Sequence, residues 1–407
     1  MQRQNIVFHS VLKQIPWARF DRLVEEHDAD WDDRVVKSKA HLIAMLYAQL
    51  CGAKGLREIE ANLRSHASKL YHLGGDTISR SALSSANRLR PVEVFGGLLS
   101  ALMDQLQAGY RRKIRDCVRL IDSTSVQLSS LSTWATFSAG VCGAKAHIIY
   151  DPDADQPLYL AVTASNVNDI TAAKQMPIEA GATYVFDLAY YDYAWWAELD
   201  QAGCRIVTRL KSNTPFDVVE DRSVLPGSSI LSDRTGYLPK RLAASRRNPM
   251  STLVREIRVI IETGKVLRIF TNDLQASAQE IADLYKRRWA IELFFRWIKQ
   301  TLKISHFFGN SENAVRIQIA VALIAFLLLR LAHDANRTVA SKIAISPLAF
   351  ARLIQANLML RRSISELFQP PKEPEPQQPR FDFGPATTRA ARRRRDCRAR
   401  VAMEKAA

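Results

Sequence analysis

The order of hydrophobic and polar positions divides this chain into a helical part and a β-rich part. In residues 1 to about 112, apolar side chains recur every three or four positions, which places them on one face of a helix. Such runs cover residues 10–20, 39–50, 56–63 and 91–106. We therefore expect an all-helical N-terminal domain over residues 1–112.

A polar, hydroxyl-rich stretch at residues 77–90 separates two of these helical runs. Ser79 stands where its side chain would cap a short helix. The arginines Arg80, Arg88 and Arg90 are available to phosphates, so the stretch suits a helix-turn-helix-like contact with DNA. A solvated linker between helices is an equally good interpretation of the same composition.

The pattern changes at Cys117, where short apolar runs take over. Runs that predict strands lie at 117–122, 144–150, 157–163, 183–187 and 205–210, with helical stretches at 170–175 and 193–201. Hairpin-like strands followed by alternating helix and strand predict an α/β layer fold with a mixed sheet. Residues 113–211 form its first part.

Residues 212–273 break this alternation. They contain several prolines and glycines, and β-rich runs at 252–261 and 266–271, so they predict a β-rich insertion. Helical periodicity then resumes, and residues 274–368 complete the α/β domain with C-terminal helices. The Pro-rich and then Arg-rich residues 369–407 have the composition of a disordered tail.

Composition narrows the class of protein. The most hydrophobic run, 317–329, is too short to span a bilayer and suits a buried helix. No signal peptide follows Met1, so we expect a cytoplasmic, nucleoid-associated protein without a membrane partner. The five cysteines form no CxxC pair, which argues against structural zinc and disulfides. A net charge of +16 favours nucleic acid as the partner.

The stretch 285–299 contains the most informative candidate chemistry. On one continuous helix, at about 100° per residue, Tyr285, Arg288, Glu292 and Lys299 would project within an arc of roughly 60°. A carboxylate beside two cations and a phenol suits a place where a metal ion meets a phosphate backbone. The alternative is that Arg288 and Glu292 form an ion pair that merely stabilises the helix.

The spacing Y-x2-R-x3-E-x6-K resembles the signature of the insertion-sequence-four family of bacterial DDE transposases and matches it at all four positions. Ile121-Asp122-Ser-Thr and Phe186-Asp187-Leu-Ala-Tyr190 resemble the two Asp boxes of that family, with Ala189 where the family often has Gly. Residues 143–147 and 207–211 resemble two further family segments. The resemblance extends from residue 1 to about 368.

The resemblance implies a ribonuclease-H-like catalytic domain that is interrupted by the β insertion and preceded by a helical DNA-binding domain. It implies that Asp122, Asp187 and Glu292 hold two Mg²⁺ ions, for which Mn²⁺ can substitute. The residues implied to contact DNA are Tyr285, Arg288, Lys299 and Arg209. The implied activity is cut-and-paste transposition through a hairpin, on terminal inverted repeats and target DNA, with a dimer assembled on double-stranded DNA.

Elementary chemistry supports such a carboxylate set. Asp122 and Asp187 each follow an apolar strand, and ligand sites of α/β sheets gather at strand ends. Carboxylate oxygens suit Mg²⁺, and a pair of such ions serves both ends of a phosphodiester displacement. His147 is expected to be a polar strand residue near the site.

Other sites are poorly supported by the sequence. Residues 151–155 read D-P-D-A-D, but the Gly and the final Glu of an EF-hand loop are missing. No GxxxxGK[ST] or GxGxxG pattern appears, so no ATP or dinucleotide site is implied. Two other functions stay open: a different metal-dependent nuclease on the same fold, such as a resolvase, and a catalytically silent DNA-binding protein derived from a transposase.

Overall fold

The structure is a computed structural model that describes residues 6–32, 36–107, 113–138, 140–241, 247–302, 306–337 and 345–367. The expected disordered tail at 369–407 lies outside these residues.

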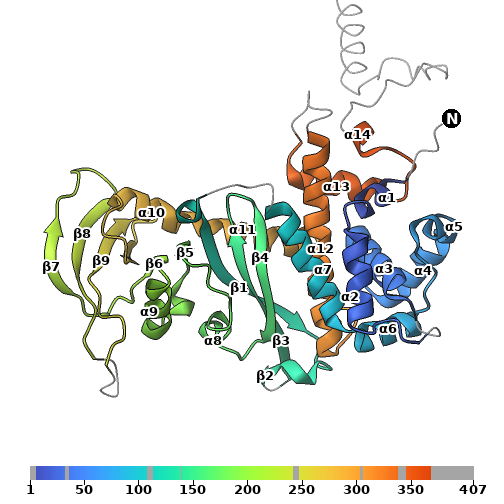
Figure 1. Ribbon diagram of the computed structural model, residues 1–407, viewed down its shortest axis with the longest axis horizontal. Helices are drawn as coiled ribbons and strands as arrows, with labels where there is room; N and C mark the ends of the chain where they lie inside the picture. The colour runs from blue at the N-terminus through green and yellow to red at the C-terminus, as the bar shows by residue number, and fades with distance from the viewer. Residues whose placement is uncertain are drawn as a thin grey trace, which may run out of the picture. The chain divides into compact units, whose positions relative to one another are not determined.

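The N-terminal part is helical, as expected (Figure 1). The helices are α1 (Val7–Leu12), α2 (Trp17–Glu26), α3 (Ser38–Cys51), α4 (Leu56–Ser65), α5 (Ala67–Leu70), α6 (Arg80–Leu89) and α7 (Val92–Gln107). The single run expected at 10–20 is wrong, because it falls on two helices, α1 and α2, separated before Pro16. Proline has no backbone N–H and disfavours the α conformation in the residue before it, so a helix ends there.

Helix α6 forms where the polar stretch 77–90 was found. The Oγ of Ser79 accepts the N–H of Ala82 at 3.3 Å, so the expected cap is present. Arg80 and Arg88 are exposed, but Arg90 is buried and its Nη1 lies 2.6 Å from Asp30. Arg90 is therefore not available to phosphates, contrary to the expectation, because it neutralises a carboxylate inside the helical part.

Residues 113–211 form the first part of a mixed sheet. Its strands are β1 (Val118–Leu128), β2 (Thr136–Ser138), β3 (Val141–Asp151), β4 (Gln156–Ala164), β5 (Thr183–Val185) and β6 (Arg205–Arg209). Its order is β4-β3-β1-β5-β6, with β3 antiparallel to its neighbours and β1, β5 and β6 parallel. This is the ribonuclease-H-like arrangement. The mixed α/β class is therefore confirmed.

The β-rich insertion extends this same sheet. Its strands β7 (Asp217–Arg222), β8 (Ile230–Tyr237), β9 (Val254–Ile260) and β10 (Val266–Thr271) are antiparallel, and β10 pairs with β6. The result is one ten-stranded sheet that ends at β7.

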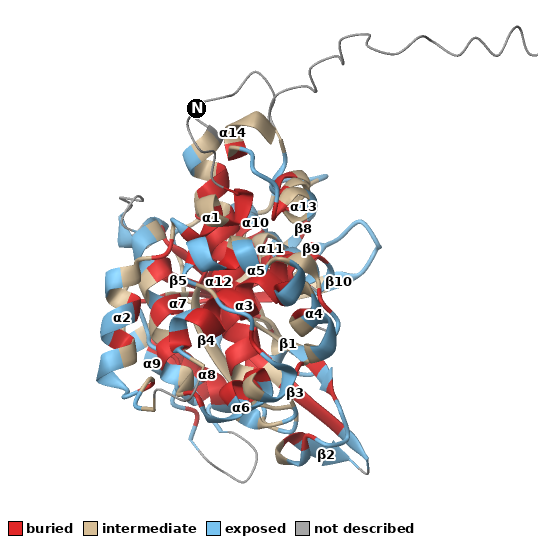
Figure 2. Cartoon of the chain, turned by 90° about the vertical axis from the view of Figure 1, so that its right-hand side faces the viewer, coloured by how far each residue is buried: buried red, intermediate tan, exposed pale blue. Residues whose placement is uncertain are grey.

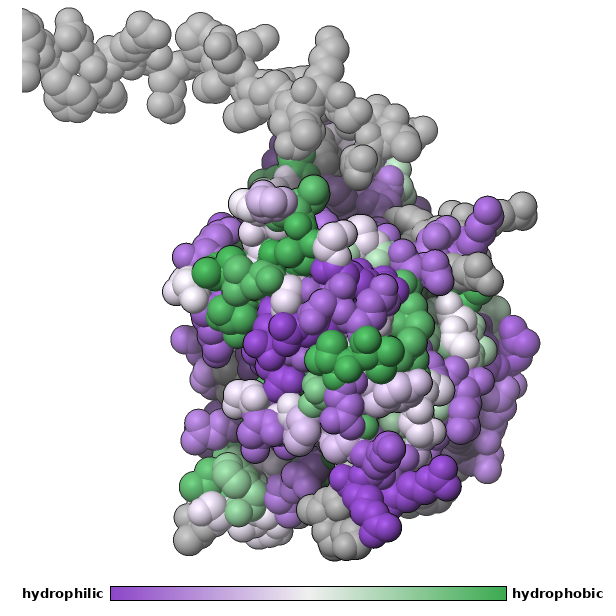
Figure 3. All heavy atoms as spheres, turned by 90° about the vertical axis from the view of Figure 1, so that its left-hand side faces the viewer, coloured by the Kyte–Doolittle hydropathy of each residue, from purple (hydrophilic) through white to green (hydrophobic). Residues whose placement is uncertain are grey.

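Viewed from the left-hand side of Figure 1, the surface is largely hydrophilic with separate apolar patches (Figure 3).

Side chains of β1 alternate between two hydrophobic cores. Leu120 and Val126 pack in the core shared with α10 (Ala278–Arg287), α11 (Trp289–Thr301) and α12 (Glu312–Arg337). Ile121 packs in the second core, with α9 (Tyr193–Gln201). Successive strand residues point to opposite faces, so the sequence of β1 builds both layers. The last helices are α13 (Pro347–Asn357) and α14 (Ile364–Leu367).

Helix α12 lies at the centre of the first core (Figure 2). By length and composition it is apolar enough to cross a membrane, but 83% of its most apolar window is buried inside the protein. It packs against α3, α6 and α7. The expected buried helix at 317–329 is therefore confirmed, although the helix is longer than its apolar run.

The cysteines behave as small core residues. Cys117, Cys142 and Cys204 are buried, and every cysteine in the described ranges is a free thiol.

Candidate active site

Asp122 lies within strand β1, not at its end. Strand β5 pairs with β1 only as far as Leu120, whereas β3 pairs with β1 through Leu128. The expectation of a strand end at Asp122 is therefore wrong, because the long hairpin partner β3 keeps the polar residues after Ile121 extended. Asp122 nevertheless sits just beyond the end of its parallel neighbour, with a side chain 19% exposed.

Asp187 lies two residues beyond β5, at the strand end that was expected. Its Oδ1 accepts the N–H of Ala189 at 2.8 Å and begins a short 3-10 turn, Leu188–Tyr190. Because β5 is parallel to β1 and adjacent to it, the two aspartates lie beside one another.

The Y-R-E-K stretch occupies two consecutive helices, so the expectation of one continuous helix is wrong. Helix α10 ends at Arg287 and α11 begins at Trp289, while Arg288 keeps α-helical backbone angles (φ −51°, ψ −30°). The N–H of Arg288 bonds to the carbonyl of Tyr285, three residues back. This three-residue bond makes a tighter turn than the α-helix on either side. The sequence has no Gly or Pro there, so the spacing of apolar residues alone could not reveal the break between the two helices.

Arg288 joins two of the three predicted carboxylates. Its Nη2 lies 2.5 Å from Oε1 of Glu292, and its Nη1 lies 3.6 Å from Oδ2 of Asp122. The ion pair within the helical stretch is therefore present, but the same guanidinium also reaches across to β1. A role confined to helix stabilisation does not explain that second contact.

Lys299, the last residue of the Y-R-E-K stretch, also contacts strand β1. Its Nζ donates to the carbonyl of Ser125 on β1 at 2.9 Å. Asp122, Glu292 and Lys299 line one open cleft of about 390 Å³. Arg296 and Gln300 line it as well, and sequence reasoning missed both; the signal was there, because Arg296 stands four positions after Glu292.

Tyr285 is buried and has two arginines near its ring. The guanidinium carbons of Arg209 and Arg288 each lie 5.9 Å from the centre of its ring, within the range of cation–π attraction. These contacts connect β6 to the junction of α10 and α11. Burial raises the pKa of the Tyr285 hydroxyl, and the nearby charge of Asp187 acts in the same direction.

The electrostatics of the site favour a cation. Burial raises the pKa of Asp122 to about 6, and the neighbouring charges of Asp187 and Glu292 act in the same direction. The N–H of Ser123 and the guanidinium of Arg288 act in the opposite direction. Carboxylates that hinder one another's ionisation suit hard cations such as Mg²⁺. Within the described ranges, however, no three Asp, Glu, His or Cys side chains converge closely enough to hold one metal ion.

The acidic turn at residues 151–155 serves another purpose. Asp151 accepts from Arg119 at 3.0 Å, Asp153 pairs with Arg287 of α10, and Asp155 pairs with Arg330 of α12. Asp153 and Asp155 thus fasten the β3–β4 hairpin to the helices that follow the insertion, and Asp151 ties it to β1.

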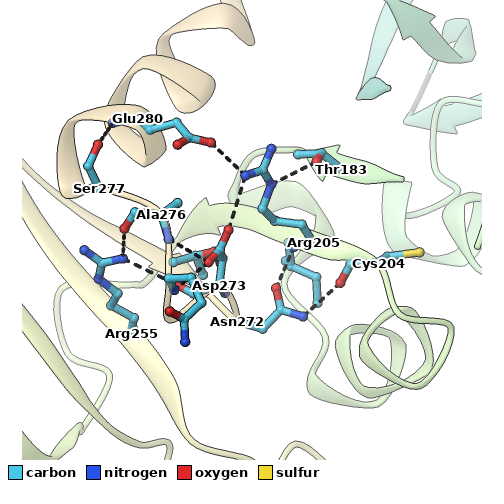
Figure 4. Close-up of polar contacts among 12 residues, drawn as sticks. Thr183, Cys204, Arg205, Arg255, Asn272, Asp273, Ala276, Ser277 and Glu280 are labelled. Carbon is cyan, nitrogen blue, oxygen red and sulfur yellow. Dashed lines mark hydrogen bonds and ion pairs between the residues drawn. The ribbon is translucent and has the colours of Figure 1, made fainter. Parts of the chain in front are cut away.

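A second polar group fixes the start of α10 (Figure 4). Arg205 of β6 donates to Thr183 at 2.9 Å, to Asp273 at 3.2 Å and to Glu280 of α10 at 2.8 Å. These contacts join β5, β6, the end of β10 and α10. The helix that carries Tyr285 is therefore attached directly to β5, which precedes Asp187, and to β6, which ends at Arg209.

The comparisons with known proteins agree with this architecture. Residues 113–328 match the family model described as a transposase DDE domain, and residues 3–75 match one described as a domain of unknown function. A putative transposase, y4zB, of Sinorhizobium fredii is 41% identical over 71% of this chain and 80% of its own length. The probable transposase for insertion sequence element IS5377 of Geobacillus stearothermophilus is 29% identical over 67% of this chain and 72% of its own length.

A structural comparison gives a weaker likeness. The piggyBac transposase in a synaptic complex with hairpin DNA aligns with 95% of this chain and 83% of its own, at 8% identity and a TM-score of 0.46. A likeness this distant says nothing of the function of the chain.

The sheet order is that of a ribonuclease-H-like domain, and the match to the transposase DDE domain model makes the chain an enzyme of the DDE class. The chain belongs to the transposase DDE domain family, whose model matches more than half of it, and it is an insertion-sequence transposase. The resemblance drawn from the Y-R-E-K spacing is thereby confirmed.

Proposed function

We propose that this transposase cleaves DNA at the ends of its element and joins the freed ends to target DNA, with Asp122, Asp187 and Glu292 as metal ligands. The observation that carries the proposal is the placement of these carboxylates: Asp122 lies on β1 and Asp187 just beyond its parallel neighbour β5, and one guanidinium, that of Arg288, contacts both Asp122 and Glu292. DDE transposases generally depend on divalent metal ions, and an all-carboxylate donor set fits two Mg²⁺, or Mn²⁺ in their place. Bound there, such ions would activate the attacking oxygen and stabilise the leaving oxygen.

The basic residues of the site hold the DNA backbone in this proposal. Arg288 exchanges its contacts with Asp122 and Glu292 for a phosphate, to which a guanidinium offers two parallel N–H donors. Lys299, which lines the same cleft as these two carboxylates, offers a point charge. Tyr285 keeps Arg209 and Arg288 close to its ring, so both cations act on the same stretch of strand.

Cleavage and joining follow one chemical scheme. Water attacks the phosphorus at the element end, and the bond from phosphorus to the 3′ oxygen breaks. The freed 3′-hydroxyl then attacks the opposite strand to close a hairpin, which is reopened before the 3′ end attacks target DNA. Each step exchanges one oxygen on phosphorus for another, so the same set of residues serves them all.

The N-terminal helices supply recognition of the terminal inverted repeats. The outward face of α6 carries Arg80, Ser81, Ser84, Ser85 and Arg88, all exposed, and no carboxylate. Neither arginine has an ion-pair partner among the described residues. The inner face of α6 packs on α4 and α12, which favours a rigid element for contacting DNA over a linker. The active assembly is a dimer on double-stranded DNA, in the cytosol at the nucleoid.

The test uses DNA that carries the inverted repeats flanking the coding region. Asp122→Ala, Asp187→Ala and Glu292→Ala should each abolish cleavage in Mg²⁺ and leave DNA binding intact. The control is Asp283→Ala, since Asp283 is an exposed carboxylate on α10 outside the cleft. Near wild-type cleavage by any one of the three variants would remove that residue from the site. Wild-type protein that binds the ends but cleaves in neither Mg²⁺ nor Mn²⁺ would instead be a silent DNA-binding protein.

A further inference from the structure

A half-buried polar cluster occupies the sheet face opposite the carboxylate of Asp122. Side chains alternate along β1, so Ser123 lies on the face that packs α8 (Asp169–Ala173) and α9, whereas Asp122 faces α11. His147 is the register partner of Ser123, and Lys145 that of Ser125, so both share the face of Ser123. Asp169, the first residue of α8, completes the cluster.

One carboxylate oxygen collects the contacts of this cluster. Oδ1 of Asp169 accepts from Lys145 Nζ at 3.1 Å and from Ser123 Oγ at 3.0 Å, and it lies 3.7 Å from His147 Nδ1. The side chain of Asp169 is only 17% exposed. Burial lowers the pKa of the fully buried His147, and the ammonium group of Lys145 pairs with Asp169.

Ser123 connects this cluster to the active site. Its backbone N–H donates to Oδ1 of Asp122 at 2.8 Å, while its hydroxyl donates to Asp169 on the other face. Beyond Leu120 the ladder between β1 and β5 has ended, so on that side Asp122 and Ser123 lack backbone pairing. The hydroxyl contact with Asp169 supplies an anchor where the ladder is missing.

We propose that Asp169 is a positioning residue for metal binding: held by Lys145, it fixes Ser123, and Ser123 fixes the carboxylate of Asp122. The inference rests on the proposed role of Asp122 as a metal ligand. A purely structural ion pair would tie α8 to the sheet without affecting metal affinity. Residues that orient a metal ligand in this way typically alter affinity or activity 10–100-fold when replaced.

The experiment measures Mn²⁺ binding to the full chain without DNA, from the electron paramagnetic resonance signal of free Mn²⁺. The site is defined as the binding that Asp122→Ala abolishes. Asp169→Asn should raise the half-saturating Mn²⁺ concentration about tenfold or more. Ser123→Ala should act in the same direction, and Ser123→Thr, which keeps the hydroxyl, should restore much of the affinity. Ser123→Ala also decides the matter if Asp169→Asn fails to fold, because it keeps the pair of Asp169 with Lys145.

The control is Asp192→Asn. Asp192 also pairs with a lysine, Lys174, at 2.7 Å and caps α9, but within the described part of the chain no hydrogen bond joins it to Ser123. We expect wild-type Mn²⁺ affinity in this variant. Unchanged affinity in both Asp169→Asn and Ser123→Ala, or an equal loss in Asp192→Asn, would overturn the proposal. Wild-type protein without any Asp122-dependent Mn²⁺ binding would instead overturn the proposed metal site itself, and the positioning role with it.

Discussion

At the scale of single residues, substitutions of Arg288 and Lys299 test whether these side chains act in the reaction or only stabilise their helix. We predict that Arg288→Gln and Lys299→Gln each reduce cleavage and joining by about tenfold or more, because a lost charge-assisted contact costs about 1.5–3 kcal/mol. The control is Lys286→Gln, since Lys286 is exposed on α10 and outside the cleft. Rates on DNA that carries the inverted repeats provide the measurement. A control as impaired as Lys299→Gln would mean that bulk positive charge, not these contacts, drives the reaction.

The raised pKa of Asp122 gives a stability prediction. Its pKa of about 6 in the folded chain exceeds the ordinary value of 3.8, so the folded state holds the proton more tightly. The contribution of Asp122 to stability is therefore lost as pH rises from about 4 to about 6. In chelator, Asp122→Asn should raise the melting temperature more at pH 7.5 than at pH 5. A larger gain at pH 5 would contradict the stated burial of this carboxylate.

Sequence reasoning found these residues unevenly. The Y-R-E-K spacing identified Tyr285, Arg288, Glu292 and Lys299 because they lie close in sequence. It did not reveal the contact of Arg288 with Asp122, because that contact joins positions far apart in the chain. Arg90 was misjudged for a related reason: its partner, Asp30, lies far away in the chain, in the turn that follows α2.

At the scale of secondary-structure elements, the group around Arg205 sets the position of α10. We predict that Arg205→Ala lowers the free energy of unfolding by about 1–3 kcal/mol, because it leaves the low-exposure Asp273 without its cation. It should also slow cleavage, since α10 carries Tyr285. The matched control is Arg234→Ala, whose exposed pair with Asp221 should contribute less than about 1 kcal/mol. Urea unfolding of both variants makes the comparison, and equal losses would deny Arg205 a special role.

The boundaries of the elements were less predictable than their types. Apolar spacing placed α9 and β10 well, but it ended β1 at Asp122 because the following residues are polar. Extended structure continues there only because β3 supplies a partner. The junction at Arg288 likewise leaves no mark in local composition.

At the scale of the whole molecule, the charge of +16 predicts binding to DNA that weakens steeply with salt, because phosphate contacts release counterions. Replacing Arg80 and Arg88 together by Ala should reduce affinity for end DNA and make the slope of log affinity against log salt shallower. The control is Arg19→Ala, since Arg19 already pairs with Glu26 on α2. Fluorescence anisotropy across salt concentrations gives both quantities, and an unchanged slope would exclude α6 from the contact.

The N-terminal helices cannot be treated as a detachable module. Helices α3 and α7 pack on α12, and one hydrophobic core runs from Phe8 to Phe350. Composition indicated a helical region and a β-rich region, but it could not show that they share this core. Point substitutions on the surface of α6 are for that reason sharper tests of recognition than removal of residues 1–112.

The pairing of β10 with β6 also bears on how small such an enzyme can be. Removing residues 212–273 would take away β10 and leave the N–H and C=O groups of β6 along that side without a partner. An unpaired, apolar edge strand is a template for aggregation between chains. A shortened transposase of this kind would therefore need a new cap on β6, such as a charged or proline-bearing segment, to stay monodisperse.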